Sequence, residues 1–365
     1  MRLLYLAAAD SIHAYRWIKY LAERGHQIYW ISLTPLTAGD PIPNVRLQVI
    51  PQWHSKATGV VVATFAARRR LMSEQFDIVH SHYAGTYGLI GALSTKKNLA
   101  VTAWGSDVLL SRHSVVKRPL LKFILQRASV ITCDADHMVE AMVQLGIDRK
   151  KIHIILFGTD TNRFKPFGKD PKILDQWGAR TEQIIISLRS LYPIYDIPTL
   201  VKAVPIIVQR VPNIKVIIVG PGPERQALEQ LVQESNVAKQ VCFCGAVKNT
   251  MLPLLLSSAD VYVSTSLSDA GLAASTAEAM SCGVPVVITD SGENHKWVED
   301  GVQGFVVKVR DFTALANKII WLLEHPTEAK TMGLNGREAI DTRNSYLREM
   351  AKVERLYEDL VIKAD

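Results

Sequence analysis

Residues 264–287 read STSLSDAGLAASTAEAMSCGVPVV. The apolar run at residues 261–265 predicts a strand that ends in a small, polar, glycine-containing loop. A helix is expected to begin near Ser275 and to stop at Gly283, because glycine is typical of helix C-termini. A second strand is expected to follow Pro285. This order of strand, loop, helix and strand is typical of parallel α/β sheets.

The loop and the start of this helix form a candidate seat for a diphosphate. Free backbone N–H groups and the positive end of the helix dipole attract phosphate oxygens at such a position. We expect the loop residues Gly271 and Leu272 and the amides of Ser275 and Thr276 to bind a nucleotide donor there, with Glu278 accepting hydrogen bonds from ribose hydroxyls. Ser275 and Glu278 also match a capping box, which needs no ligand, so this alternative stays open.

The same alternation of strands and helices runs along the whole chain. Apolar runs occur in the first half at residues 3–8, 27–32, 78–80, 100–103, 130–132 and 152–156, and in the second half at 184–188, 215–219, 241–244, 261–265, 284–289 and 305–307. Helical patterns separate these runs, and the first is expected over about residues 13–24, with Asp10 or Ser11 as its N-cap. Strands that alternate with helices imply parallel sheets covered on both faces.

The length of 365 residues favours two domains. Two prolines and a glycine place a linker at residues 166–180, between an N-terminal domain over 1–165 and a C-terminal domain over 181–342. A last helix over 343–365 has no strand after it and is expected to pack back on the N-terminal domain. Two doubly wound α/β domains that face each other would form a cleft, in which ligands bind at the carboxyl ends of the strands.

The composition excludes several classes of protein. Hydrophobic residues make up 48% of the chain and charged residues 21%, so both domains can build cores and general disorder is excluded. No apolar run approaches the roughly 20 residues that cross a bilayer, and the N-terminus enters a strand directly rather than a signal peptide, so we expect a cytoplasmic protein. Four scattered cysteines without a Cys-x-x-Cys pair favour reduced structural thiols.

Several spaced motifs resemble retaining glycosyltransferases of the GT4 group, whose two Rossmann-like domains form the GT-B fold. Residues 278–287 are similar to the donor-site helix of that family, 301–307 to its next turn and strand, 157–166 to its interdomain segment, and 219–223 to a turn of its C-terminal domain. The resemblance covers almost the whole chain. It implies transfer of a hexosyl group from a nucleotide sugar to a saccharide or lipid-linked acceptor in polysaccharide or glycoconjugate synthesis, by front-face displacement and without a cofactor.

The resemblance also assigns residues to the donor site. Arg189 would bind the diphosphate. In the alternative interpretation, Arg189 forms a buried structural ion pair with a carboxylate. The first of two family glutamates falls on Ala270, so Asp269 would supply a carboxylate from the same loop. The usual lysine partner of the arginine falls on Ile194 or Tyr195. A UDP-hexose is favoured as the donor and GDP-mannose is second, because no residue in the sequence identifies the base.

In the first domain, Trp104 falls where the family often has a histidine that faces the sugar. The Trp104 ring would pack on a sugar, and Asp107 would hydrogen-bond to that sugar. In the alternative interpretation, Trp104 belongs to the core and Asp107 caps a helix. His13 and Arg16 share a helix face. His13 titrates near neutrality and is the candidate to take the acceptor proton, with a plain surface histidine as the alternative. Arg16, Trp104 and His82 are assigned to acceptor or sugar binding.

Two patterns that resemble metal sites favour other interpretations. His80 and His82 share a strand face, but no third ligand is near them in the sequence. Asp134 and Asp136 lie between a strand and a helix, where capping is expected. No metal is therefore expected, and Arg189 with backbone dipoles would neutralise the leaving diphosphate.

The positive charge is concentrated in the first half, where 21 Lys and Arg residues face 11 Asp and Glu residues up to Lys165. Residues 60–70 and 112–127 mix basic and apolar side chains like an interfacial helix. Peripheral contact with the inner face of the cytoplasmic membrane would suit a lipid-linked acceptor, and the alternative is a domain helix with a solvated face. Nucleic acid is not an expected partner, because neither stretch contains a recognition motif.

Other functional classes stay open beside the transferase. A UDP-sugar epimerase could use the same scaffold and would release a free monosaccharide without an acceptor. A catalytically silent sugar-nucleotide-binding protein would bind nucleotide without transfer or donor hydrolysis, and Trp104, Ala270 and Tyr195 motivate this alternative. A two-Rossmann dehydrogenase is disfavoured, because the glycine-rich fingerprint is missing after the first strand.

Overall fold

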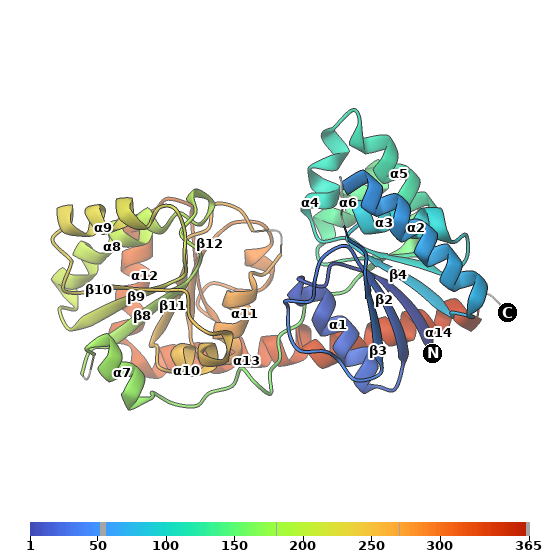
Figure 1. Cartoon of the computed structure of the whole chain (residues 1–365). Coiled ribbons are helices and arrows are strands. Elements are labelled where there is room, and N and C mark those ends of the chain that lie inside the picture. Colours follow the sequence, from blue (N-terminus) through green and yellow to red (C-terminus); the bar gives the residue numbers. More distant parts are fainter. Residues whose placement is uncertain (52–55, 180, 270, 363–365) are drawn as a thin grey trace. The chain divides into compact units, whose positions relative to one another are not determined.

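The computed structural model describes residues 1–51, 56–179, 181–269 and 271–362 (Figure 1). The chain divides into two compact units. Unit 1 comprises Met1–Phe157 and Leu347–Asp365, and unit 2 comprises Gly158–Tyr346. The chain therefore leaves unit 1 once and returns to it with its last helix.

Unit 1 is built on a parallel sheet of seven strands in the order β3-β2-β1-β4-β5-β6-β7. The strands are β1 (Arg2–Leu6), β2 (Gln27–Ser32), β3 (Val45–Val49), β4 (Ile78–His82), β5 (Leu99–Thr102), β6 (Val130–Cys133) and β7 (Ile152–Ile154). The winding direction reverses between β1 and β4, where Leu6 lies beside Ser81. Ligands of such sheets bind at the carboxyl ends of the strands at this switch point.

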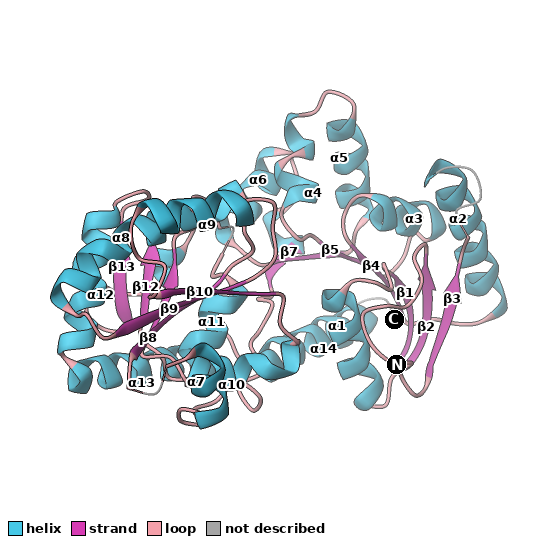
Figure 2. Ribbon diagram, turned by 60° about the vertical axis from the view of Figure 1, so that its left-hand side comes forward, coloured by secondary structure: helices cyan, strands magenta, loops and turns pink. Residues whose placement is uncertain are grey.

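Helices cover both faces of this sheet. They are α1 (Ile12–Glu23), α2 (Lys56–Ser73), α3 (Thr86–Ser94), α4 (Ser106–Leu109), α5 (Lys117–Arg127), α6 (Asp136–Gln144) and α14 (Tyr346–Ile362), with 3₁₀ turns at Ser111–His113 and Arg149–Lys151. Figure 2 shows α2, α3 and α5 over one face and α1 and α14 over the other. Successive side chains of β1 alternate accordingly, because Leu4 and Leu6 join the core that contains Ile90, whereas the Tyr5 hydroxyl hydrogen-bonds to Tyr357 of α14 at 2.7 Å.

Unit 2 is built on a parallel sheet of six strands in the order β10-β9-β8-β11-β12-β13. Its strands are β8 (Gln183–Leu188), β9 (Ile214–Val219), β10 (Val241–Gly245), β11 (Val261–Ser264), β12 (Val286–Thr289) and β13 (Gly304–Val307). Its helices are α7 (Pro171–Trp177), α8 (Ile197–Arg210), α9 (Arg225–Glu234), α10 (Leu252–Ser257), α11 (Ala274–Ser281), α12 (Phe312–Glu324) and α13 (Pro326–Arg343), with 3₁₀ turns at Pro193–Tyr195, Asn249–Met251 and Asn294–Lys296. The winding direction reverses between β8 and β11.

These two sheets confirm the predicted fold class, two Rossmann-like α/β domains. Each of the twelve predicted apolar runs overlaps a strand, and Ser11 caps α1, its side chain accepting a hydrogen bond from the Ala14 amide. The sequence does not predict β3, because this edge strand is only partly buried and lacks a continuous apolar run.

The boundary between the units differs from the predicted one. It lies between Phe157 and Gly158, and part of the predicted linker is the helix α7. Asp170 caps that helix and Pro171 occupies its first turn, where a missing N–H has no consequence. Upstream, the buried Phe164 accepts a hydrogen bond at its carbonyl from Ser281 of unit 2. Pro171 therefore marks a helix start rather than a free linker.

Candidate functional site

A cluster of polar side chains lies at the switch point of unit 2. Arg189 follows β8 directly, and its Nη2 donates to Ser266 Oγ at 2.7 Å and to Asp269 Oδ1 at 2.6 Å. The side chains of Arg189 and Asp269 are each 9% exposed. The Nη1 atom of Arg189 lies 3.5 Å from Ser275 Oγ of α11, and the guanidinium lies 4.3 Å from the centroid of the Tyr195 ring. The predicted donor residues Arg189, Asp269 and Ser275 are thus brought together.

A glycine turn after β9 holds the backbone beneath this cluster. Gly220 has a φ of +145°, and a Cβ atom there would lie 2.5 Å from the Arg189 carbonyl oxygen. A Cβ atom at Gly222 would lie 2.3 Å from the carbonyl oxygen of Leu191. The Leu191 amide also donates to the carbonyl of Pro221 at 2.9 Å. The backbone of the turn at residues 220–222 touches the backbone of residues 189–191, so only glycine fits at Gly220 and Gly222. This contact fixes the direction in which the chain leaves β8 at Arg189.

The start of α11 differs from the predicted capping box. Ala273 is the N-cap, and its side chain makes no cap hydrogen bond. The Ser275 hydroxyl instead lies 2.8 Å from the Tyr262 hydroxyl of β11. Thr276 is buried beside the same tyrosine, and Glu278 is half-buried on the helix. The capping-box interpretation with Ser275 as N-cap is therefore wrong, and the N-cap residue Ala273 has no polar side chain to cap the first N–H groups of α11.

The alternative that Arg189 forms a structural ion pair is observed, but the pair is incomplete. Within the part of the chain that the structure describes, the buried Nε of Arg189 and Oδ2 of Asp269 have no hydrogen-bond partner. A buried polar atom without a partner costs about 1–3 kcal/mol, so most such atoms find one. The cluster therefore keeps hydrogen-bonding capacity for a polar ligand.

A second candidate site, the β1–β4 pocket, lies within unit 1 at the carboxyl ends of β1 and β4. It has a volume of about 370 Å³ and is lined by Ala8, Asp10, Ser11, Ala14, Leu33, Thr34, His82, Tyr83, Thr86, Tyr87 and Trp104. The pocket thus combines several hydroxyls, one carboxylate, one imidazole and three large aromatic rings. Pockets of this composition bind small polar ligands.

His82 is the most buried polar side chain of this pocket, at 2% exposed. Its ring packs against Trp17, with 4.8 Å between ring centroids, and against Tyr5 at 5.3 Å. Neither of its ring nitrogens has a hydrogen-bond partner among the described residues. Burial, followed by the neighbouring His80 and His13, holds its pKa well below the usual value, so the imidazole is neutral.

His13 lies beside the pocket rather than at the surface. Its ring stacks on Trp104 with 5.0 Å between centroids and meets Phe157 edge-on at 4.2 Å. Burial, and then the charge of Arg16, lowers the pKa of His13 to about 4, which corrects the expectation that it titrates near neutrality. The Arg16 guanidinium lies 4.5 Å from the centroid of the same Phe157 ring, so the two residues share a helix face as predicted.

Asp107 does not face a ligand. It is 3% exposed, and its oxygens accept hydrogen bonds from the amides of Ala84 at 2.8 Å, Trp104 at 3.1 Å and Val108 at 3.1 Å. The carboxylate joins the turn after β4 to the turn after β5. The predicted contact between Asp107 and a sugar is therefore not supported, and the residue positions Trp104 instead.

Neither pattern that resembled a metal site forms one. The His80 ring uses both nitrogens, one with Thr102 Oγ1 at 2.7 Å and one with the Tyr357 hydroxyl. Ala135 rather than an aspartate is the N-cap of α6, and Asp136 lies in the first turn. No three His, Cys, Asp or Glu residues in the described ranges are grouped to hold a metal ion.

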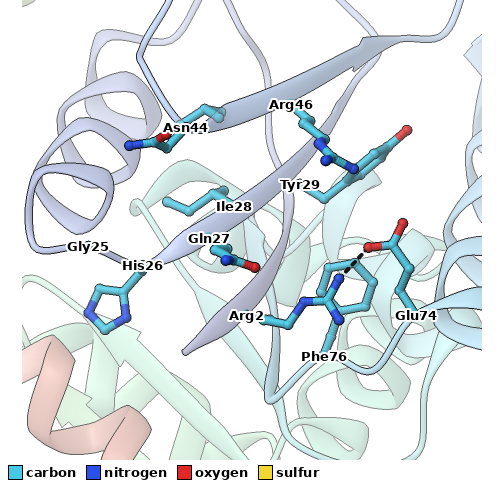
Figure 3. A pocket seen from close by; sticks show the side chains of 11 residues that line it. Arg2, Gly25, His26, Gln27, Ile28, Tyr29, Asn44, Arg46, Glu74 and Phe76 are labelled. Carbon is cyan, nitrogen blue, oxygen red and sulfur yellow. Dashed lines mark hydrogen bonds and ion pairs between the residues drawn. The ribbon is translucent and has the colours of Figure 1, made fainter.

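A larger hollow, of about 570 Å³, lies at the amino ends of β1 and β2 (Figure 3). Arg2 and Glu74 form an ion pair of 2.5 Å in it, and Arg46 lines its rim beside Tyr29. Among its described lining residues, no buried side-chain polar atom lacks a partner. It lies at the end of the sheet opposite to where ligands of parallel sheets bind, so we do not assign it to the functional site.

Sequence reasoning missed part of both clusters. Ser266, Tyr262 and the hydroxyls of Thr34 and Thr86 were not assigned, although Ser266 and Thr34 follow strands, Tyr262 lies on β11 and Thr86 begins α3. Their positions at the carboxyl ends of strands were a usable signal. Tyr195, expected only as a substitute for a lysine, stacks on Arg189.

Two Rossmann-like units, each with a polar cluster at its switch point, define the class of GT-B glycosyltransferases. The family model Glycosyltransferase Family 4 matches residues 11–163, and the model Glycosyl transferases group 1 matches residues 169–339. The chain therefore belongs to the GT4 group of glycosyltransferases and is a hexosyltransferase that uses a nucleotide sugar.

The curated relatives are similar over most of their length. The N-acetyl-alpha-D-glucosaminyl L-malate synthase of Bacillus anthracis is 26% identical over 94% of this chain and 92% of its own. A GDP-mannose-dependent alpha-(1-6)-phosphatidylinositol monomannoside mannosyltransferase of Mycolicibacterium smegmatis is 29% identical over 79% of this chain and 80% of its own.

Solved structures share the fold at lower identity. HepE of Anabaena in complex with UDP has a TM-score of 0.80 and 19% identity, over 98% of this chain and 100% of its own. Sucrose-phosphate synthase of Thermosynechococcus elongatus has a TM-score of 0.80 and 21% identity, over 100% of both chains. These similarities support the fold.

Proposed function

We propose that the protein is a retaining glycosyltransferase that moves a hexosyl group, with a UDP-hexose favoured as donor and GDP-mannose second. The observation that carries this proposal is the incomplete pair of Arg189 and Asp269 at the switch point of unit 2. HepE was solved with UDP, and the mannosyltransferase from M. smegmatis is named for GDP-mannose, so both donors have a precedent among similar proteins.

The donor is held by charge and by backbone donors. Arg189 binds two phosphate oxygens with its planar guanidinium, as arginine does in bidentate pairs. The loop at Gly271 and Leu272 and the amides of Ser275 and Thr276 add N–H groups at the start of α11. Glu278, next on this helix, accepts hydrogen bonds from the ribose. The developing charge on the diphosphate is thus stabilised without a metal.

Transfer then proceeds on one face of the sugar. The bond between the anomeric carbon and the phosphate oxygen breaks, the bond to the acceptor oxygen forms, and the acceptor proton passes to the leaving phosphate oxygen. With a pKa of about 4, His13 is neutral near pH 7 and is too weak a base to keep that proton. We assign it to hydrogen-bonding and positioning of the acceptor, beside Trp104 and Arg16.

A second feature concerns the source of the acceptor. Residues 83–127 contain seven Lys and Arg residues and a single acidic one, the buried Asp107, and α2 contains no acidic residue. Val115 is 90% exposed and Val116 is 82% exposed just before α5. Basic and apolar groups together favour an anionic lipid surface over a merely solvated helix. We propose peripheral contact there with the inner face of the cytoplasmic membrane and a lipid-linked acceptor, while the cytoplasmic location stays a prediction.

No helix in the described parts of the chain is both long and apolar enough to span a bilayer. The helices proposed to meet the lipid surface are α2, α3 and α5, which lie side by side in Figure 1.

A thermal-shift screen against UDP, GDP, ADP and their sugars tests the proposed function, followed by transfer and donor-hydrolysis assays with the best donor. Stabilisation by one nucleotide and transfer with a retained anomeric configuration, read by proton NMR of the product, are expected. Release of an epimerised free sugar without an acceptor would identify an epimerase. Binding without transfer or hydrolysis would identify a silent binding protein.

A further inference from the structure

We infer that the β1–β4 pocket binds an uncharged, hydroxyl-rich ring, so that the acceptor ends in a neutral saccharide or polyol rather than in a carboxylate or phosphate. His82 is the residue that determines this specificity. The inference rests on the proposed function, because it names the chemical class of the acceptor for the same reaction.

The hydrogen-bonding chemistry of His82 is the first argument. Both nitrogens of this buried ring lack a partner among the described residues, and the ring lines the pocket. A neutral imidazole offers one N–H donor and one acceptor nitrogen. A hydroxyl group also donates and accepts, so hydroxyls on one ring satisfy both nitrogens. A carboxylate or phosphate oxygen only accepts, and would leave the second nitrogen buried without a partner.

The charge of the pocket is the second argument. Its described lining contains neither lysine nor arginine, and its one ionisable acid is the exposed Asp10. Asp10 accepts a hydrogen bond from the Thr34 hydroxyl at 3.0 Å and has further lone pairs for sugar hydroxyls. The nearby Arg16 is not among the lining residues and lies against Phe157. An anionic acceptor would therefore meet a like charge without a counter-charge.

The shape of the pocket is the third argument. Trp104 forms one wall, and its ring is held by stacking on His13 and by the amide contact with Asp107. A volume of about 370 Å³ is near the small end of ligand pockets, which span about 300–1,000 Å³. One saccharide ring, with its C–H face on the indole, matches this combination of size and surface.

Saturation-transfer NMR on the full-length protein tests the inference, with and without UDP. The neutral probes are methyl α-glucopyranoside, methyl α-mannopyranoside and myo-inositol, and the anionic probes are glucuronate and L-malate. We expect at least one neutral probe to bind and the anionic probes to bind at least tenfold more weakly. Failure of every neutral probe in both conditions, or equal binding of the anionic probes, would overturn the inference.

Two variants locate the binding. His82→Phe keeps a ring of similar size and should weaken binding of the neutral probe about tenfold, whereas His113→Phe, on an exposed 3₁₀ turn, should not. Should His82→Phe fail to fold, Asp10→Lys at the exposed rim is the second variant, and it should admit glucuronate. A folded His82→Phe with unchanged affinity, or an Asp10→Lys protein that still rejects glucuronate, contradicts the inference.

Failure of the inference is distinguishable from failure of the proposed function. Transfer to anionic and neutral acceptors at similar rates would remove the inference and keep the transferase. Binding of a neutral ring to the pocket without transfer from any nucleotide sugar would remove the transferase and keep the pocket assignment.

Discussion

Asp269 pairs with Arg189 at 2.6 Å although 80 residues separate them in the chain. The carboxylate draws the loop after β11 toward the end of β8, and Ser266 and Ser275 complete the polar cluster. A phosphate group that enters here competes with Asp269 for the same guanidinium. Under the proposed function, the pair would hold Arg189 in position until a donor binds.

Arg189→Lys should weaken UDP binding at least tenfold. Lysine keeps the charge but loses the planar fork that bonds two phosphate oxygens, a change of about 1.4 kcal/mol or more. Isothermal titration calorimetry measures the affinity. Arg210→Ala, which removes an exposed ion pair with Glu324 elsewhere in unit 2, is the matched control and should bind UDP like the parent protein. Equal affinity in Arg189→Lys would remove this residue from the donor site.

Glu278→Ala should weaken nucleotide binding by about 1–3 kcal/mol, the range for lost hydrogen bonds to a charged group. Ser275 is not the N-cap of α11, because Ala273 occupies that position, so the pair Ser275 and Glu278 does not form the predicted capping box. The affinity for UDP is compared with that for the UDP-sugar, after circular dichroism has established the fold. A folded variant that binds both as tightly as the parent protein contradicts the ribose contact.

His13→Phe should lower kcat about tenfold or more while the donor affinity changes little. Phenylalanine preserves the stack on Trp104 and the edge contact with Phe157 but removes the ring nitrogens. Steady-state kinetics with saturating donor separates kcat from the donor KM. Full turnover in this variant would show that the nitrogens of His13 take no part in the reaction.

The free energy of unfolding should fall as the pH is lowered from about 6.5 toward 4. His13 has a pKa of about 4 when folded, against 6.5 ordinarily, and the pKa of His80 is lowered to about 3, in both cases chiefly by burial. At pH values between the folded-state pKa of each histidine and 6.5, the unfolded chain binds a proton that the folded chain does not. Acid therefore favours unfolding in this interval, and the effect is absent above about pH 6.5.

Urea denaturation at about pH 7, 6 and 5 measures this loss of unfolding free energy. These pH values lie above the range in which most carboxylates titrate. His13→Phe should lose less stability over the interval, whereas His113→Phe, at an exposed residue, should follow the parent protein. Parallel curves for His13→Phe and the parent protein would show that His13 is not the buried titrating group.

Vesicles of phosphatidylglycerol and phosphatidylcholine should carry the protein upward in a flotation gradient at low salt. In the proposed contact, the exposed Val115 and Val116 would insert among the head groups, and the basic residues around them would attract anionic lipid, an attraction that salt screens. The double variant Val115→Ser and Val116→Ser should float less, whereas Val309→Ser, at an exposed valine of unit 2, should not change. If the parent protein stays at the bottom of the gradient with every vesicle composition, an acceptor free in solution is favoured.

The sequence alone predicted those features that depend on neighbouring residues in the chain. Apolar runs bounded by glycine, proline and polar residues marked twelve strands, and the order of strands and helices predicted two parallel sheets. The start of α11 was assigned to a diphosphate site from its loop and helix N-terminus, and Arg189 from the resemblance to the GT4 group. These inferences need no knowledge of which distant residues touch.

Tertiary structure decided every feature that depends on burial or on a partner far along the chain. Asp107 turned from a candidate ligand contact into a bridge between two turns because Ala84 and Trp104 lie beside it. The Phe157 and Trp104 rings, from distant segments, help to bury His13, and this burial lowers its pKa. The His82 ring packs against Tyr5 and Trp17, and neither of its nitrogens has a partner among the described residues. Propensity acts over a few neighbouring residues, whereas desolvation and hydrogen bonding depend on residues that only folding brings together.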